Sequence, residues 1–212
     1  MTPQHHLPAD IERTSMHIIT EELAQRRLEV PPENAAVVKR VIHTTADFDY
    51  AQSLHFTPAA VAAGIAAMHE GVTIITDTNM AMAGITKPGL AKLGGQAMCF
   101  MADPAVAAAA KEAGTTRAVA AMHKAAQEYP RAVLAVGNAP TALLAIAEEI
   151  ENGLRPALVI GVPVGFVNVV ESKEEILKDP VPYIVARGRK GGSNVAAAIC
   201  NALLYTAAGR TL

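Results

Sequence analysis

Apolar side chains recur every three or four residues in the first third of the chain. Between residues 8 and 28 they include Ile11 and Leu23, and polar residues fill the positions between them. This spacing predicts an amphipathic helix over 8–28. The same rhythm predicts a second helix after Pro32 and a third over 58–70.

From residue 72 onward the pattern changes to short, continuous apolar runs that are typical of buried strands. The runs lie at 72–76, 97–101, 132–136, 157–160 and 183–186. Helical spacing returns between and after them, at 104–112, 115–129, 140–152, 171–178 and 193–208. Buried strands that alternate with helices predict an α/β fold of three layers, α/β/α, around a central, mostly parallel five-stranded sheet.

The chain has 212 residues and contains no internal repeat or low-complexity linker. We therefore expect a single domain over 1–212, with 1–10 as a flexible tail. The formal net charge of −2 gives no bias toward nucleic acid or an anionic membrane. No apolar run reaches the roughly 18 residues that a membrane span needs, and the polar start does not resemble a signal peptide, so a cytoplasmic location is expected.

Two cysteines, Cys99 and Cys200, are present, and each stands in an apolar run. Distant cysteines in such surroundings predict buried thiols rather than a disulfide or a metal pair.

Ligands of parallel α/β sheets bind beyond the carboxyl ends of the strands. The segments that follow the predicted strands are rich in Gly, Pro, Asn or Thr, at 76–86, 137–142, 161–168 and 187–193. In GNAPTA (137–142) a turn leads into a helix, whose free N–H groups would favour an anion. An ordinary strand-to-helix turn is the alternative for this segment.

The segment 187–193, RGRKGGS, places three cations before two glycines and a serine. The guanidinium groups of Arg187 and Arg189 match carboxylates or phosphates, glycines allow close backbone approach, and Ser193 is expected to cap the last helix. A solvated basic turn is the alternative. No phosphate-loop or dinucleotide-binding motif occurs, so a nucleotide site is not supported.

Of the histidines, His43 is the best candidate for chemistry. It ends a predicted helix and precedes two threonines and Asp47. A helix C-terminus would favour the imidazolium, which suits a proton donor near neutral pH. The others are expected in the tail or in structural and surface roles: His5, His6, His17, His55, His69 and His123. Neither a metal site nor a nucleophile motif is predicted.

Together, several segments of the chain resemble the signature segments of the precorrin-8X methylmutases. The resemblance extends from about residue 11 to residue 208, and the order and spacing of the pieces make it specific. The segments are TSMHII (14–19), RVIHTTADFD (40–49), TDTNMAMAGIT (76–86), TTRA (115–118), GNAPTALL (137–144), GVPVGFVNVVESKE (161–174) and RGRKGGS (187–193).

This resemblance implies an isomerase of cobalamin biosynthesis. It would move a methyl group from ring carbon 11 to ring carbon 12 of precorrin-8X or cobalt-precorrin-8, giving hydrogenobyrinic or cobyrinic acid. The resemblance also implies a homodimer with its active sites close to the subunit interface, no dissociable cofactor, and transient contacts with neighbouring pathway enzymes. Its partners would be tetrapyrroles, with neither nucleic acid nor membrane.

The site residues are carried over by motif. His43 takes the place of the catalytic histidine, which would protonate or hydrogen-bond a ring nitrogen. Asp77 and Met80 match a family segment but receive no role. The substrate-binding positions are Ser15, Thr86, Arg117, Asn138, Arg187, Arg189, Gly191 and Gly192.

Two other readings of the sequence remain. A non-catalytic tetrapyrrole-binding protein would keep the pocket but lose the proton donor, and the segment around His43 is intact. An α/β enzyme acting on a phosphorylated small molecule would use the segments 137–142 and 187–193, but no nucleotide motif or acidic metal cluster accompanies them. The sequence does not decide whether the substrate carries cobalt.

Overall fold

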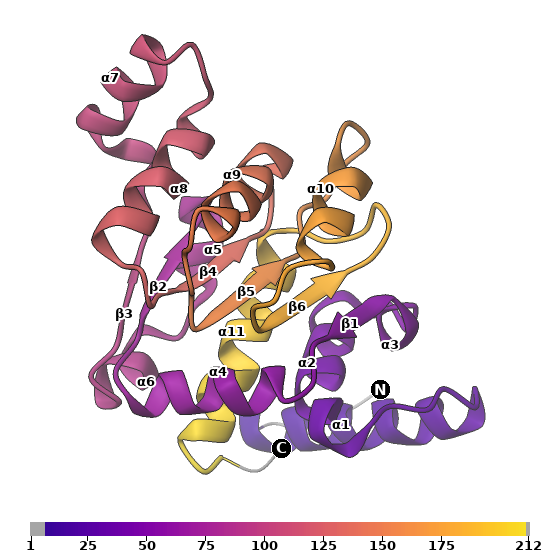
Figure 1. Ribbon diagram of the computed structural model, residues 1–212. Coiled ribbons are helices and arrows are strands. Elements are labelled where there is room, and N and C mark those ends of the chain that lie inside the picture. Colours follow the sequence, from indigo (N-terminus) through magenta and orange to yellow (C-terminus); the bar gives the residue numbers. More distant parts are fainter. Residues whose placement is uncertain (1–6, 211–212) are drawn as a thin grey trace.

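The computed structural model describes residues 7–210 and contains one six-stranded sheet with helices on both faces (Figure 1). The strands lie in the order β1-β6-β5-β4-β2-β3. Their bounds are Leu54–Phe56 (β1), Thr73–Thr76 (β2), Gln96–Met98 (β3), Val133–Val136 (β4), Leu158–Gly161 (β5) and Tyr183–Ala186 (β6). Residues 1–6, with His5, His6 and most of the expected tail, lie outside the described residues.

The predicted three-layer α/β/α fold with a mostly parallel sheet is confirmed. All five predicted strands are present, and β2, β3, β4, β5 and β6 pair in parallel. The additional strand, β1, pairs antiparallel with β6, with Leu54 opposite Ala186. The polar His55 in the middle of β1 interrupts the apolar run by which the other strands were recognised, which explains why the sequence did not reveal this edge strand.

Each predicted helix is present, with small shifts at its ends. The helices are Pro8–Gln25 (α1), Ala35–Thr45 (α2), Tyr50–Ser53 (α3), Ala60–His69 (α4), Asn79–Gly84 (α5), Lys87–Lys92 (α6), Pro104–Glu112 (α7), Arg117–Glu128 (α8), Pro140–Glu151 (α9), Val169–Ile176 (α10) and Ser193–Ala207 (α11). Short 3-10 turns occupy Pro32–Asn34 and Phe100–Ala102. The short helices α3, α5 and α6 were not predicted. None of the described helices is both long and apolar enough to cross a membrane.

Alternate residues of each strand enter two separate hydrophobic cores. In β4, Val133 packs with α2, α4 and α11, whereas Leu134 packs with α8 and α9 on the other face. Helix α11 lies deep in the first core, where Cys200 is fully buried and burial raises its pKa to about 12. Both cysteines are free thiols, as predicted, but Cys99 is only partly buried because β3 lies at the edge of the sheet.

Candidate active site

His43 lies in the last turn of α2, and the cap residue Ala46 that follows this helix has a left-handed conformation (φ 54°). It borders an open cavity of about 670 Å³. Ser15 of α1 faces the same cavity, and Lys190 enters it from the loop between β6 and α11. The two helices and the loop thus bring together residues that are distant in the sequence, in a volume suitable for a small-molecule ligand.

The surroundings of His43 lower its pKa. Burial is the largest cause, the positive charge of Arg40 adds to it, and the carboxylate of Glu12 opposes it. Arg40 is 7% exposed, and its guanidinium lies 2.6 Å from Glu12 Oε1. The helix C-terminus alone would favour the imidazolium, but burial and the charge of Arg40 shift the His43 pKa downward.

Lys190 connects the 187–192 loop to the segment that follows α2. Its Nζ lies 2.6 Å from a carboxylate oxygen of Asp47 and 2.6 Å from one of Asp49. These ion pairs raise the pKa of Lys190. They also fix the basic loop beside the His43 cavity, although none of the three charges is deeply buried.

The two arginines of this loop are placed differently. Arg187 donates two hydrogen bonds, at 2.8 and 2.7 Å, to the carboxylate of Glu174 on α10. Arg189 lies with its guanidinium carbon 5.5 Å from the ring centroid of Phe166, a side chain that is 81% exposed. Arg189 has no carboxylate partner among the described residues, which leaves its charge available to a ligand.

The glycines of the loop allow close packing of backbone on backbone. A Cβ on Gly191 would lie 2.1 Å from the carbonyl oxygen of Val162, and Gly192 has φ 140° and donates its N–H to the same oxygen. Ser193 does not cap α11, contrary to prediction: Gly192 is the N-cap residue. The Ser193 hydroxyl instead lies 2.8 Å from that of Thr78.

The N–H groups in the turn before α9, which were expected to bind an anionic ligand, bind the carboxylate of Asp77 instead. This carboxylate, 1% exposed, accepts hydrogen bonds from the N–H groups of Gly137, Asn138 and Ala139 at 2.8, 2.8 and 2.7 Å. Burial raises the pKa of Asp77, and the three N–H groups limit this rise. The prediction that these N–H groups would bind an external anion is wrong, while the Asn138 residue remains exposed.

The hydroxyl groups of Ser15, which lines the His43 cavity, and of Thr86 are both hydrogen-bonded within the protein. The Ser15 hydroxyl donates to Ile11 O within α1 at 2.8 Å. The Thr86 hydroxyl lies 2.9 Å from the hydroxyl of Tyr205. The guanidinium carbon of Arg40 lies over the Tyr205 ring, 5.1 Å from its centroid. Thr86 is therefore connected to the turn of α2 that precedes His43.

Arg117 opens α8 and is exposed. The adjacent Thr116 hydroxyl lies 3.3 Å from that of Thr141 in α9, so Arg117 stands near the start of α9. The structure thus groups His43, Ser15 and Lys190 around one cavity, whereas Arg187, Arg189, Gly191 and Gly192 of the same loop do not line it. Arg117 and Asn138 lie farther along the same edge of the sheet, by the end of β4.

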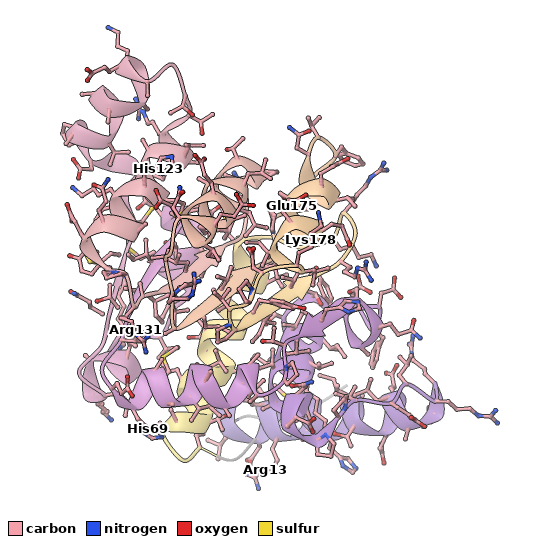
Figure 2. All side chains as sticks on the ribbon, viewed as in Figure 1. Arg13, His69, His123, Arg131, Glu175 and Lys178 are labelled. Carbon is pink, nitrogen blue, oxygen red and sulfur yellow. The ribbon has the colours of Figure 1, made fainter. Side chains whose placement is uncertain are left out.

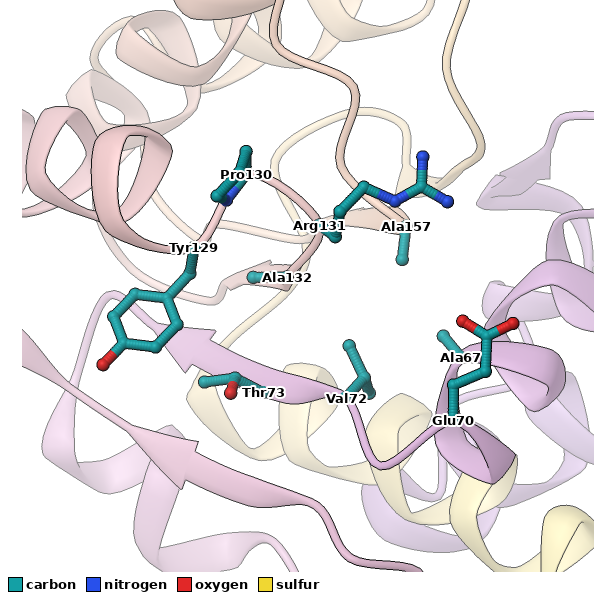
Figure 3. Close-up of a pocket in the computed structure, with 9 residues that line it drawn as sticks. All are labelled: Ala67, Glu70, Val72, Thr73, Tyr129, Pro130, Arg131, Ala132 and Ala157. Carbon is teal, nitrogen blue, oxygen red and sulfur yellow. The ribbon is translucent and has the colours of Figure 1, made fainter.

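A smaller cavity of about 240 Å³ opens at the opposite edge of the sheet (Figure 3). Its lining includes Val72 and Thr73 at the start of β2, and Arg131 and Ala132 just before β4. None of the candidate residues lines this cavity. Ligands of parallel sheets bind at the carboxyl ends of strands, which favours the cavity at His43.

Comparison with known proteins shows the family of the chain. The family model for precorrin-8X methylmutase matches residues 10–206. The crystal structure of a precorrin-8X methyl mutase from Thermus thermophilus superposes with a TM-score of 0.86 at 40% identity, covering 95% of this chain and 99% of that one. The chain belongs to the precorrin-8X methylmutase family. It is accordingly an isomerase of corrin biosynthesis that acts by methyl migration.

Curated methylmutases are similar over most of their length. The cobalt-precorrin-8 methylmutase of Salmonella typhimurium is 45% identical over 202 residues, 93% of this chain and 95% of that protein. The one from Priestia megaterium is 44% identical over 197 residues, 92% and 87% of the two chains. The precorrin-8X methylmutase of Pseudomonas aeruginosa is 40% identical over 177 residues, 82% and 85%.

Two features of this methylmutase were missed by sequence reasoning. The first is Lys173 of α10, whose side chain is fully buried and whose pKa burial lowers to about 8. The second is the Glu12–Arg40 pair beside His43. The burial of Lys173 could have been suspected, because this lysine stands at an otherwise apolar position of its helix. Nothing in the sequence indicates that Glu12 pairs with Arg40.

The remaining described histidines of the methylmutase lie away from the His43 cavity. His123 on α8 lies 2.6 Å from Glu149, and His69 ends α4 (Figure 2). His17 lies 3.2 Å from Glu21 within α1. His55 is in the edge strand β1, where burial lowers its pKa.

Proposed function

We propose that this methylmutase moves a methyl group from ring carbon 11 to ring carbon 12 of precorrin-8X or cobalt-precorrin-8, with His43 as the proton donor. The observation that carries the proposal is the cavity of about 670 Å³ that His43 shares with Ser15 and Lys190. It combines one titratable imidazole with a basic loop, as a site for a polycarboxylate macrocycle requires.

The chemistry assigned to His43 is general-acid assistance. Its imidazolium donates a proton, or a hydrogen bond, to a ring nitrogen near the migrating methyl group and withdraws electrons from the conjugated system. The lowered pKa of His43 makes the imidazolium a stronger acid. The methyl group leaves one ring carbon and bonds to another in the same molecule, so no oxidant or second substrate takes part.

The rim of the site supplies cations and apolar surface. Arg189 and Arg117 are the proposed partners of the substrate carboxylates, because exposed guanidinium groups bind carboxylates strongly. Lys190 is instead engaged with Asp47 and Asp49. Phe166 and Val167, which are 81% and 77% exposed, would contact the flat ring. Ser15, Thr86, Asn138, Arg187, Gly191 and Gly192 complete the proposed substrate site.

A homodimer is proposed for the assembled enzyme. The support is the exposure of large apolar side chains on α1, α5 and the loop after β5: Ile11, Ile18, Met80, Val164, Phe166 and Val167. We expect the second subunit to cover part of this apolar surface, since large exposed apolar patches mark interaction sites. Sedimentation velocity would give a dimer mass in the micromolar range, and a monomer at that concentration would contradict the assembly.

We place the enzyme in the cytoplasm, in transient contact with the enzymes before and after it in the pathway. Tight retention of the product would then precede its direct transfer. Release of bound product into buffer should be slow compared with turnover, and rapid spontaneous release would argue against direct transfer.

The test of function combines binding with turnover. Purified protein is mixed with hydrogenobyrinic acid, and separately with cobyrinic acid, and the visible spectrum is recorded after gel filtration. Near one pigment per subunit supports the corrin site, and the better-retained ligand indicates the natural form. His43→Ala should bind a shifted or weaker complex and lose turnover, whereas retention of turnover would overturn the role of His43.

The same test separates the two alternatives. A non-catalytic tetrapyrrole-binding protein would retain the pigment but would not convert the substrate. An enzyme for a phosphorylated small molecule would retain neither corrin.

A further inference from the structure

Lys173 is an unusual residue for its surroundings. It lies in α10 with 0% of its surface exposed, and lysine is almost never fully buried unless its ammonium is paired. No carboxylate among residues 7–210 forms an ion pair with it. Its polar partners are two backbone carbonyl oxygens of the basic loop. The buried ammonium group therefore stabilises one conformation of that loop.

The hydrogen bonds turn one stretch of the loop backbone toward α10. Lys173 Nζ donates to the carbonyl oxygen of Gly188 at 2.7 Å and to that of Lys190 at 2.8 Å. Between them, the carbonyl oxygen of Arg189 accepts from the N–H of Gly165 at 3.2 Å. Three successive carbonyl groups of the loop therefore face the protein.

This orientation determines where the next N–H groups point. In a planar trans peptide the C=O of one residue and the N–H of the next are antiparallel, and the described chain contains no cis peptide bond. The N–H groups of Arg189 and Gly191 consequently point away from Lys173, and that of Lys190 points away from Gly165. None of the three donates to an acceptor within the described part of the protein, whereas the N–H of Gly192, which follows them, donates to Val162 O.

Successive N–H groups that point to one side form a concave binding site for an anion. The side chain of Lys190 leaves the same loop and lines the cavity that holds His43. We propose that Lys173 is a positioning residue, which turns the loop carbonyls inward so that the N–H groups of Arg189, Lys190 and Gly191 receive a peripheral carboxylate of the substrate. This inference rests on the proposed function, because it assumes a polycarboxylate ligand in that cavity.

The proposal explains why an ammonium occupies this place. An apolar side chain of the same length would fill the space but would leave two inward carbonyl oxygens without a donor, and buried acceptors are costly to leave unpaired. The loop would then turn its carbonyls toward solvent and its N–H groups away from the ligand. Lys173 thus acts on binding through the backbone without touching the substrate.

The matched variants are Lys173→Met and Lys178→Met. Methionine keeps most of the lysine stem and removes only the ammonium. Lys178 follows α10, is exposed and pairs only with the nearby Glu175 (Figure 2), so Lys178→Met is the control. Lys173→Met should weaken the binding of hydrogenobyrinic or cobyrinic acid by about tenfold to a hundredfold and raise KM, with a smaller change of kcat at saturation. Lys178→Met should change none of these quantities.

A second readout follows the N–H groups themselves. In ¹⁵N-labelled wild-type protein, the amide resonances of Arg189, Lys190 and Gly191 should move downfield when product is added, as hydrogen bonds to a carboxylate form. In Lys173→Met these shifts should be lost while thermal unfolding stays cooperative. If Lys173→Met does not fold, the wild-type spectrum decides: unshifted amides at saturating product overturn the proposal.

The outcomes separate this inference from the proposed function. If wild-type protein retains neither corrin, the proposed function fails. If wild-type protein binds but Lys173→Met binds equally well with the same amide shifts, the function stands and the role of Lys173 is overturned. Lys173→Met could also lose stability and affinity to the same extent, while the amide resonances of the wild-type protein do not move when product is added. That result would show that Lys173 has only a structural role.

Discussion

The carboxylate of Asp77 accepts a hydrogen bond from the N–H of Gly137 at 2.8 Å and so joins the ends of β2 and β4. The same carboxylate occupies the next two N–H groups, which open the turn into α9. A buried residue thus fills, from inside the protein, the place where an anionic ligand would otherwise sit. The carboxylates of the substrate must find their partners elsewhere, on the exposed cations and on the 187–192 loop.

The first prediction concerns the stability that this carboxylate provides. Asp77→Asn replaces one acceptor oxygen by an amide donor that faces N–H groups, so at least one buried hydrogen bond is lost. We expect the free energy of unfolding to fall by about 1–3 kcal/mol, measured by urea denaturation. Asp103→Asn, at the more accessible cap of α7, is the control and should have the smaller effect. An unchanged unfolding midpoint for Asp77→Asn would contradict this role.

The fold could be predicted from the sequence wherever a segment was long and periodic. Strands β2 to β6 and the helices α1, α2, α4 and α7 to α11 followed from apolar runs and their spacing. The helices α3, α5 and α6 did not, because four to six residues carry too little periodicity. Strand β1 was missed because His55 interrupts its apolar run.

The site was predictable only in its residue types. The motif around His43 and the basic loop were found, and the structure brings His43 and Lys190 of that loop to one cavity. The contacts that the site residues make within the protein could not be predicted from the sequence. Contacts such as Asp77 with Gly137 or Lys190 with Asp47 join segments that are far apart in the chain. Whether a cation is free, as Arg189 is, or committed, as Arg187 is to Glu174, depends on such pairings.

The pH dependence of turnover should report the environment of His43. If the imidazolium is the active form, kcat/KM falls as pH rises through the His43 pKa, which lies below its usual 6.5. Arg40 contributes to that lowering and Glu12 opposes it. Arg40→Met should therefore move the falling limb to higher pH, as measured from pH–rate profiles of kcat/KM.

The control for this prediction changes the charge of opposite sign. Glu12→Gln removes the group that raises the His43 pKa, so the falling limb should move to lower pH. Shifts of the two variants in the same direction would show that the limb does not report His43. Titration of His43 by NMR in each variant assigns the midpoint directly.

The two arginines of the loop should differ in their effect on binding. Arg189 is not held by a carboxylate of the described protein, so Arg189→Ala should weaken product binding by about tenfold or more, because a charge-assisted hydrogen bond is lost. Arg187 is engaged with Glu174 by two hydrogen bonds, and Arg187→Ala should have the smaller effect on affinity. Spectroscopic titration with hydrogenobyrinic or cobyrinic acid measures both. Unaltered affinity in Arg189→Ala would remove this arginine from the site.

The last prediction separates a ligand contact of Thr86 from its structural bond. The hydroxyl groups of Thr86 and Tyr205 lie 2.9 Å apart, so either Thr86→Val or Tyr205→Phe removes this hydrogen bond. If the Thr86 hydroxyl contacts substrate, Thr86→Val should weaken product binding by roughly two- to tenfold, the value of one neutral hydrogen bond. Tyr205→Phe keeps the ring over which Arg40 lies, and should lower thermal stability slightly without changing product affinity. Equal losses of affinity in the two variants would mean that the bond between the residues matters, and that Thr86 acts only by supporting α11 beside α2.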